Sequence, residues 1–178
     1  MAVGAGLSFE LAFKLTELLD GYFGYAQGIS LLYLPAGVKL LFILIGRIPA
    51  LVGLTLMASY VAVEEWAGYG LWAPISFAVV AQVNYYLAVY WMVRWLGINQ
   101  FLTNMRYWHI VVLSLVVSLV NGIILNVVYL WEGVSVPTNF LSRSAAMTLG
   151  DFMGCFAVTS LFQLLAAALK NRVPAVER

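Results

Sequence analysis

Residues 107–131 read YWHIVVLSLVVSLVNGIILNVVYLW and contain no aspartate, glutamate, lysine or arginine. A bilayer has a hydrocarbon core about 30 Å thick, and a helix that rises 1.5 Å per residue crosses it in about 20 residues. This stretch is therefore long enough and apolar enough to cross a membrane as a helix. It predicts a membrane protein before any other part of the chain is considered.

The composition of all 178 residues agrees with this prediction. Charged residues make up 10% of the chain, whereas soluble globular proteins contain about 25%. Hydrophobic types reach 63%, and the mean hydropathy is +0.94. These values exclude a nucleic-acid binder with a basic face, a disulfide-built secreted module and a disordered linker. One cysteine and one histidine also exclude an internal disulfide and a bis-histidine haem site.

Other charge-free runs predict further spans. They cover residues 48–63, 66–93 and 152–169, and a fifth candidate run, 28–46, is interrupted only by Lys39. We therefore expect an all-α, polytopic transmembrane helix bundle of five or six spans. The five firm spans are placed near residues 28–46, 48–63, 71–95, 108–131 and 145–169.

The basic residues predict the orientation of the bundle. With five spans, one side collects Arg47, Arg94, Arg106, Lys170, Arg172 and Arg178. The opposite loops carry Glu64, Glu65 and Glu132, and Arg143 is their basic exception. Because cytoplasmic loops are enriched in lysine and arginine, the C-terminus is expected in the cytoplasm and the N-terminus outside. The tryptophans lie near span ends, as in an aromatic belt: Trp66, Trp72, Trp91, Trp95, Trp108 and Trp131.

The N-terminal segment has a different pattern. Glu10, Lys14 and Glu17 recur on one helical face, and leucines cover the other. This pattern predicts an amphipathic helix within residues 1–27, lying at the interface or closing over the bundle. The alternative is a sixth span with a polar face inside the bundle, which places the N-terminus in the cytoplasm. The chain is thus one integral membrane domain, 1–178, with the bundle at 28–169 and a cytoplasmic tail at 170–178.

Polar residues inside the spans are the candidate functional residues, because ionisable groups are costly in lipid. Lys39 and Asp151 stand out, and their predicted depths differ too much for a direct salt bridge. We expect two polar layers: Lys39, Gln82, Asn84 and Gln163 in the cytoplasmic half, and Asn121, Asn126 and Asp151 in the outer half. The layers either fasten helices together or bound a pocket. The candidate ligand-binding residues are Lys39, Asn84, Asn121, Asp151 and Gln163.

Small residues predict where helices pack closely. Gly150 and Gly154, with Ala146 and Ala157, form overlapping small-xxx-small steps that let a neighbouring span approach. Asp151 adjoins this ridge and is expected to face protein. Pro35 is expected to bend the first span, with Gly37 keeping the bend narrow.

No catalytic constellation is present in the sequence. It lacks a Ser/His/Asp set, a phosphate-binding glycine loop, metal-spaced histidines or cysteines, and paired carboxylates in a soluble cleft. We expect a non-enzymatic protein without a cofactor or a metal.

Three stretches resemble the first membrane-associated sensor (MASE) family. They are Tyr33-Leu34-Pro35-Ala36-Gly37 with the later Gly46-Arg47, the run 77–96 with Asn84, and residues 148–154 (TLGDFMG). The resemblance covers about residues 28–165 and implies a sensory module of the bacterial inner membrane. The family positions carried over are Pro35, Gly37, Asn84, Gly150, Asp151 and Gly154. Because these residues include no effector domain, the resemblance implies signalling through a separate protein.

Three functions remain open. The first is a sensor-like module that binds a small ligand or a membrane partner between its helices and acts through a separate membrane or signalling protein. The second is the substrate-binding subunit of an energy-coupling-factor transporter, and the third is a scaffold or assembly subunit of a larger membrane complex. The expected contacts are membrane lipids, a protein partner and a small molecule, and no nucleic acid.

Overall fold

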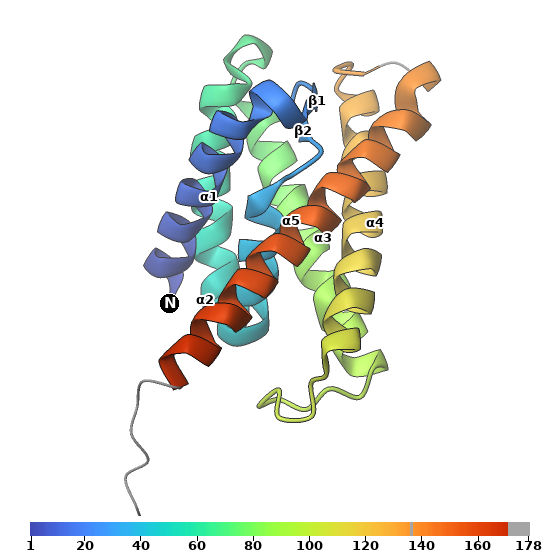
Figure 1. Ribbon diagram of the computed structural model, residues 1–178. Helices are drawn as coiled ribbons and strands as arrows, with labels where there is room; N and C mark the ends of the chain where they lie inside the picture. Colours follow the sequence, from blue (N-terminus) through green and yellow to red (C-terminus); the bar gives the residue numbers. More distant parts are fainter. Residues whose placement is uncertain (136, 171–178) are drawn as a thin grey trace, which may run out of the picture.

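The computed structural model describes residues 1–135 and 137–170, and within the last helix it omits the side chains of Gln163 and of residues 165–170. Five α-helices form a bundle, together with a two-stranded hairpin near one end (Figure 1). The helices are α1 (Ala2–Phe23), α2 (Leu34–Glu65), α3 (Trp72–Trp95), α4 (Tyr107–Trp131) and α5 (Phe140–Lys170). The short elements are β1 (Gly24–Ala26), β2 (Ile29–Ser30) and the 3₁₀ turns η1 (Ala67–Tyr69) and η2 (Pro137–Asn139).

The all-α prediction is confirmed, and four segments are long and apolar enough to cross a membrane. They are Leu34–Glu65, Trp72–Trp95, Tyr107–Trp131 and Pro137–Phe162. The spans predicted at 71–95 and 108–131 match α3 and α4 to within one residue. The last helix starts at Phe140, five residues before the predicted 145, because its first turn carries polar residues that a hydropathy criterion discards.

Helix α2 reverses its direction at Arg47. This residue has φ 48° and ψ −128°, values that are not helical, and Pro49 follows in the next turn. Lys39 before the break and Ala58 after it line the same cavity, although they would lie about 28 Å apart on a straight helix. The chain therefore forms a first limb, 34–46, and a second limb, 48–65, which correspond to two of the predicted spans (Figure 1).

The prediction that the first span begins at Gly28 is wrong. Residues 24–30 form the hairpin, residues 31–33 are irregular, and the helix begins at Leu34. Pro35 lies in the first turn, where its missing N–H costs nothing and its fixed φ suits a helix start. Pro35 therefore starts the limb. The prediction that it bends a longer span is wrong.

Helix α1 packs along the second limb of α2. Its buried residues are mostly small (Ala5, Gly6, Ala12 and Thr16), and Phe9 is the large one. A Cβ built on Gly6 would lie 3.5 Å from Met57 Cβ, and the Met1 side chain reaches Gly46. The leucines of α1 point outward, with Leu7, Leu11 and Leu18 between 56% and 79% exposed. The helix thus lies beside the bundle along its length and does not lie across one end.

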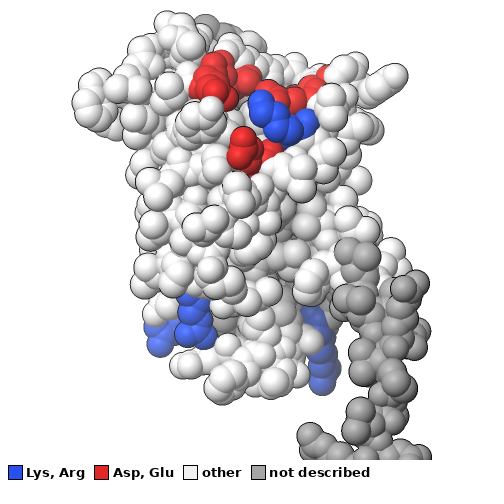
Figure 2. Space-filling model, turned by 90° about the vertical axis from the view of Figure 1, so that its left-hand side faces the viewer, with Lys and Arg blue, Asp and Glu red and all other residues white. Residues whose placement is uncertain are grey.

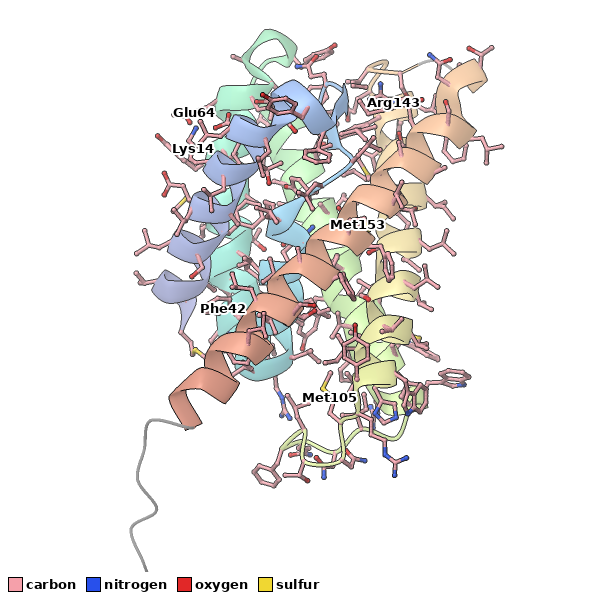
Figure 3. The ribbon with its side chains drawn as sticks, in the orientation of Figure 1. Lys14, Phe42, Glu64, Met105, Arg143 and Met153 are labelled. Carbon is pink, nitrogen blue, oxygen red and sulfur yellow. The ribbon has the colours of Figure 1, made fainter. Side chains whose placement is uncertain are left out.

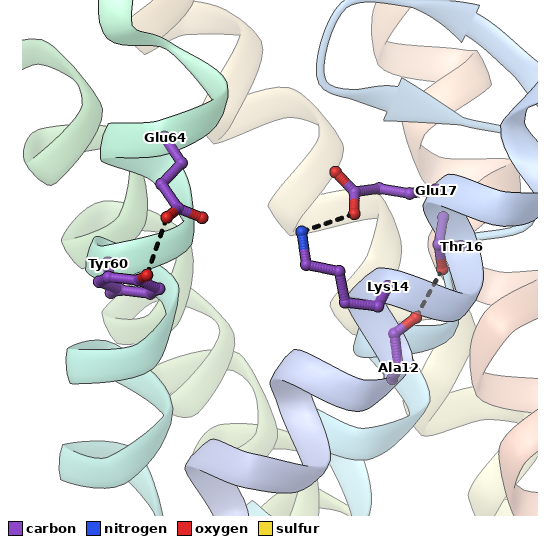
Figure 4. Close-up of polar contacts among 6 residues, drawn as sticks. All are labelled: Ala12, Lys14, Thr16, Glu17, Tyr60 and Glu64. Carbon is purple, nitrogen blue, oxygen red and sulfur yellow. Dashed lines mark hydrogen bonds and ion pairs between the residues drawn. The ribbon is translucent and has the colours of Figure 1, made fainter.

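The predicted polar stripe of α1 is on the outside. Lys14 Nζ donates to Glu17 Oε2 at 2.8 Å, and Tyr60 and Glu64 lie on the facing edge of α2 (Figure 4). Lys14 and Glu17 are therefore exposed, and the sixth span stays a prediction.

Charge separates the two ends of the molecule. Glu64, Lys14 and Arg143 lie toward one end and Met105 toward the other (Figure 3). On the face that Figure 2 shows, the acidic side chains gather at the first end and the lower end carries positive side chains alone. We call them the acidic end (Glu17, Asp20, Glu64, Glu65, Glu132) and the arginine end (Arg47, Arg94, Arg106). Arg47 Nη2 donates to the Gln100 carbonyl at 3.3 Å, which joins the reversal of α2 to the loop after α3.

One tryptophan departs from the predicted aromatic belt. Trp66 is 4% exposed and packs against Phe77 and Tyr129, with ring centroids 5.4 Å away in each case. Gly28, with φ 71°, lies so close to the Trp66 ring that a Cβ there would come within 2.5 Å of it. This cluster closes the acidic end of the core, and the other five tryptophans are exposed as expected.

Candidate functional site

A cavity of about 130 Å³ lies between α1, the hairpin, both limbs of α2, α3, α4 and α5. A cavity of this size has room for several water molecules or a small ligand. Its polar lining includes Ser30, Tyr33, Lys39, Gln82, Asn121 and Asp151. Residues that lie up to 121 positions apart in the sequence, from Ser30 to Asp151, thus meet in one place.

The chain before α2 packs directly against α5 beside Asp151, because Gly150 and Gly154 have no side chains. A Cβ on Gly150 would overlap the Ser30 carbonyl oxygen, and one on Gly154 would overlap that of Tyr33. The Tyr33 N–H donates to the Gly150 carbonyl at 3.1 Å. The predicted close approach at this ridge is therefore present, but the approaching chain is largely the segment 30–33 between the hairpin and α2. Asp151 is 2% exposed and faces protein, as predicted.

A chain of amides holds the Asp151 carboxylate. Asn121 Nδ2 on α4 donates to Asp151 Oδ2 at 2.6 Å, and Asn84 Nδ2 on α3 donates to Asn121 Oδ1 at 3.3 Å. Three helices are thus connected through three buried side chains. Hydrogen bonds to an ionised acceptor are shorter and stronger than neutral ones, so this carboxylate is fixed in its orientation.

Lys39 is held by aromatic rings. Its side chain is 2% exposed, and Nζ lies 4.5 Å from the ring centroid of Tyr85 and 5.6 Å from that of Tyr33. A desolvated ammonium over an aromatic face gains electrostatic energy from the ring. Among the residues that the structure describes, the one ion pair within 4 Å is Lys14–Glu17, so Lys39 and Asp151 share the cavity without direct contact.

Tyr85 connects three elements behind Lys39. Its hydroxyl donates to the Ala36 carbonyl at 3.0 Å and lies 3.2 Å from Cys155 Sγ. Tyr85 and Cys155 are both fully buried. The ring that faces the Lys39 ammonium is therefore fixed by the first limb of α2 and by α5.

The cavity extends to the acidic end. Exposed carboxylates line it there, from Glu17 and Asp20 of α1 and from Glu65 of α2. Trp66, Phe77 and Tyr129 form an apolar wall below them. The site combines a negative rim with an interior that holds one ammonium and one carboxylate.

The structure changes the predicted arrangement of the polar residues. The two-layer prediction is wrong, because Lys39 and Gln82 line the same cavity as Asn121 and Asp151, and Asn84 bonds to Asn121. Depth counted at 1.5 Å per residue failed because α5 runs obliquely across the bundle (Figure 1), so Asp151 lies nearer the level of Lys39 than its count from Lys170 implied. Asn126 lies elsewhere and donates to the Gly122 carbonyl of its own helix at 2.8 Å. Gln163 lies in α5, and its side chain is outside the described part, as are residues 171–178 of the predicted tail.

Other residues of the site carried a weaker signal in the sequence. Gln82 lies in the cavity wall, and its Oε1 is buried without a hydrogen-bond partner, yet the sequence suggested only a place in a layer. Tyr85 is indistinguishable in sequence from its neighbour Tyr86. Glu17 and Asp20 fall in the N-terminal helix, whose packing was open, so their place at the rim had no sequence signal.

The polar groups of the cavity determine which kinds of ligand it can bind. Among the described residues no group of three or more histidine, cysteine or acidic side chains is placed to hold a metal ion. The interior presents a fixed carboxylate acceptor, an ammonium donor and side-chain amides, which together complement a small molecule carrying groups of both charges. Comparisons of the chain with protein-family models, with curated proteins and with solved structures found no match.

Proposed function

We propose that this chain is a sensor-like module of a bacterial inner membrane, which binds a small zwitterionic or cationic molecule in the cavity between its helices. The observation that carries the proposal is the shared cavity of Lys39 and Asp151, two buried charges without a direct ion pair. Buried charges in lipid are expensive and are retained mainly where they act. The acidic rim of Glu17, Asp20 and Glu65 would attract a positively charged group.

The proposed orientation follows from charge. Arg47, Arg94 and Arg106 at one end support a cytoplasmic position for that end, with the cavity opening outward. Both limbs of α2 and helices α3, α4 and α5 then cross or enter the membrane, with α1 as a sixth membrane-embedded helix. The C-terminus, and with α1 embedded the N-terminus, lie in the cytoplasm.

The proposed signal is a change in packing. Gly37 lies two residues before Lys39, and a Cβ on it would meet the Gly154 carbonyl at 2.6 Å. A ligand that binds Lys39 and Asp151 together would draw the first limb toward α5 at this contact. Ligand binding shifts a conformational equilibrium only through contacts that differ between the two states. A separate membrane or signalling protein would read the shift, without catalysis in the described bundle.

Native mass spectrometry of the protein, solubilised gently from its own membrane, tests the proposal. The wild type should retain a small molecule, and Asp151→Asn and Lys39→Met should each lose it. Glu132→Gln removes an exposed carboxylate outside the cavity and should retain the molecule. A wild type that carries a protein partner and no small molecule would instead indicate an assembly subunit.

The outward-opening cavity also supports a second function, the substrate-binding subunit of a small-molecule transporter. That function shares the ligand site and differs in its partners. Recovery of the small molecule together with ATPase subunits would favour transport over sensing.

A further inference from the structure

A second cavity lies at the arginine end, opposite the ligand cavity. It has a volume of about 780 Å³ and is bounded by the reversal of α2, the last turns of α3 and the loop 97–102. Two arginines line it, Arg47 from the reversal and Arg94 from the last turn of α3. The rest of the wall is mainly aliphatic and tyrosine side chains.

Among the described residues, no carboxylate lies in this cavity with the two arginines. None of the residues lining the cavity is acidic, and the sequence has no aspartate or glutamate at 21–63 or 66–131. Arg47 bonds to a carbonyl, and Arg94 bonds to the Tyr90 hydroxyl with its guanidinium 5.2 Å from that ring. A guanidinium has five N–H donors, so each arginine keeps most of its donors for another acceptor.

The backbone holds Arg47 in place at a cost. Its φ of 48° with ψ −128° is close to the first central position of a type II′ turn, which glycine usually occupies. Such a conformation costs a non-glycine residue about 1–3 kcal/mol. Glycine would form the same turn without this strain. An arginine at this position therefore indicates a role for its side chain.

The opposite wall of the cavity is already ordered. Asn99 Oδ1 accepts from the Thr103 N–H at 3.0 Å, and Asn104 Nδ2 donates to the Gly97 carbonyl at 2.8 Å. Tyr86 and Tyr90 are stacked, with ring centroids 6.4 Å apart. Little of the cavity would have to order on binding, which favours affinity.

We infer that this cavity binds the headgroup of an anionic phospholipid of the cytoplasmic leaflet. Arg47 and Arg94 would hold the phosphate, since arginine binds phosphate oxygens with paired N–H donors. Ile43, Leu44, Ile48, Val89 and Val93 line the cavity and would contact the acyl chains. Basic pockets between helices on the cytoplasmic side are the sites where acidic headgroups bind. The aliphatic wall favours a lipid over a free phosphate compound.

Lipid titration of the full chain in mild detergent, followed by native mass spectrometry, tests this inference. Dioleoyl phosphatidylglycerol and dioleoyl phosphatidylcholine have the same acyl chains and differ in net charge. The wild type should prefer the anionic lipid by about tenfold or more, the effect of one charge-assisted hydrogen bond. Arg47→Gln/Arg94→Gln should abolish the preference. Arg106→Gln, at the same end but outside the cavity, should retain it.

Two further measurements do not depend on the folding of the double variant. Arg47→Gly relieves the strained backbone, so its thermal midpoint without added lipid should equal or exceed that of the wild type, while phosphatidylglycerol should stabilise it less. Glycerol 3-phosphate, which has the headgroup chemistry without acyl chains, should not displace the lipid. Equal retention of both lipids, a preference unchanged in Arg47→Gly, or displacement by glycerol phosphate would each overturn the assignment.

Discussion

Lys39 and Asp151 lie in one cavity without touching, and this separation determines how their charges affect stability. Both side chains are only 2% exposed, and Coulomb interactions reach further in a poorly solvated interior than in water. Lys39→Met and Asp151→Asn should each lower the thermal stability, because each leaves the other charge uncompensated. The double variant should recover part of the loss, with a coupling of about 1–2 kcal/mol in a double-mutant cycle.

The exposed pair Lys14–Glu17 is the matched control for this cycle. Its atoms are only 2.8 Å apart, but the two side chains are 53% and 38% exposed. Water and salt screen such a pair, so Lys14→Met/Glu17→Gln should show a much smaller coupling despite the shorter distance. Equal coupling in both cycles, or additive losses at Lys39 and Asp151, would mean that the cavity does not connect the two charges.

Gly150 has the least room for an added side-chain atom among the described glycines. A Cβ there would overlap the Ser30 backbone carbonyl, and a backbone atom cannot move aside as a flexible side chain can. Gly150→Ala should therefore lower the free energy of unfolding by about 1–3 kcal/mol or more. Gly21→Ala, in α1 with nothing within 4 Å of the added atom, should raise it by about 0.5–1 kcal/mol. Thermal unfolding of the two variants in one detergent gives the comparison, and opposite signs are expected.

At the scale of elements, the predictions held where a segment crosses the bundle as one regular helix. The charge-free runs 66–93 and 107–131 predicted α3 and α4 because hydropathy and length suffice for such a segment. The predictions failed at residues 28–33, because an apolar stretch has the same hydropathy whether it is helical or non-helical inside the protein. There the Leu31 N–H bonds to the Phe23 carbonyl at 2.8 Å, and the Leu34 N–H bonds to Thr16 Oγ1 at 3.2 Å. These partners are tertiary, so no local pattern identifies them.

Individual polar residues of the candidate site could be predicted from the sequence, but their arrangement in space could not. Lys39, Asn121 and Asp151 were recognised because polar groups are rare in such spans. Their meeting in one cavity depends on the packing of the first limb of α2 against α5, where a Cβ on Gly37 would meet the Gly154 carbonyl. The sequence indicated the break at Arg47, but the depth estimate did not include the oblique path of α5 (Figure 1).

The packing of α1 along the second limb of α2 makes a prediction at the scale of elements. A Cβ on Gly6 would lie 3.5 Å from that of Met57, within the range that a disulfide spans. Gly6→Cys/Met57→Cys should therefore cross-link on mild oxidation, as seen in a mass shift after thiol alkylation. Gly4→Cys/Met57→Cys should not, because an added Cβ at Gly4 has nothing within 4 Å. Cross-linking of both pairs, or of neither, would contradict the position of α1.

At the scale of the whole molecule, charge divides the two proposed sites. The ligand cavity has acidic residues at its mouth, and the lipid cavity has arginines without acidic partners among the described residues. The asymmetry on which the proposed orientation rests would thus also give each proposed site its selectivity. A small cationic group would be attracted from outside and an anionic headgroup from the cytoplasmic leaflet.

Side-specific labelling tests this orientation together with the crossing of α1. Met1 reaches Gly46 beside the reversal, so Val3 lies toward the arginine end, with Gln100, and Gly68 lies in η1 at the other end. In intact bacterial cells a membrane-impermeant maleimide should label Gly68→Cys, whereas Val3→Cys and Gln100→Cys should react only after permeabilisation. The wild type gives the background, because Cys155 is fully buried. Labelling of Val3→Cys in intact cells would place the N-terminus outside and show that α1 does not cross. Labelling of Gln100→Cys with protection of Gly68→Cys would reverse the whole molecule, so that the acidic mouth would open to the cytoplasm.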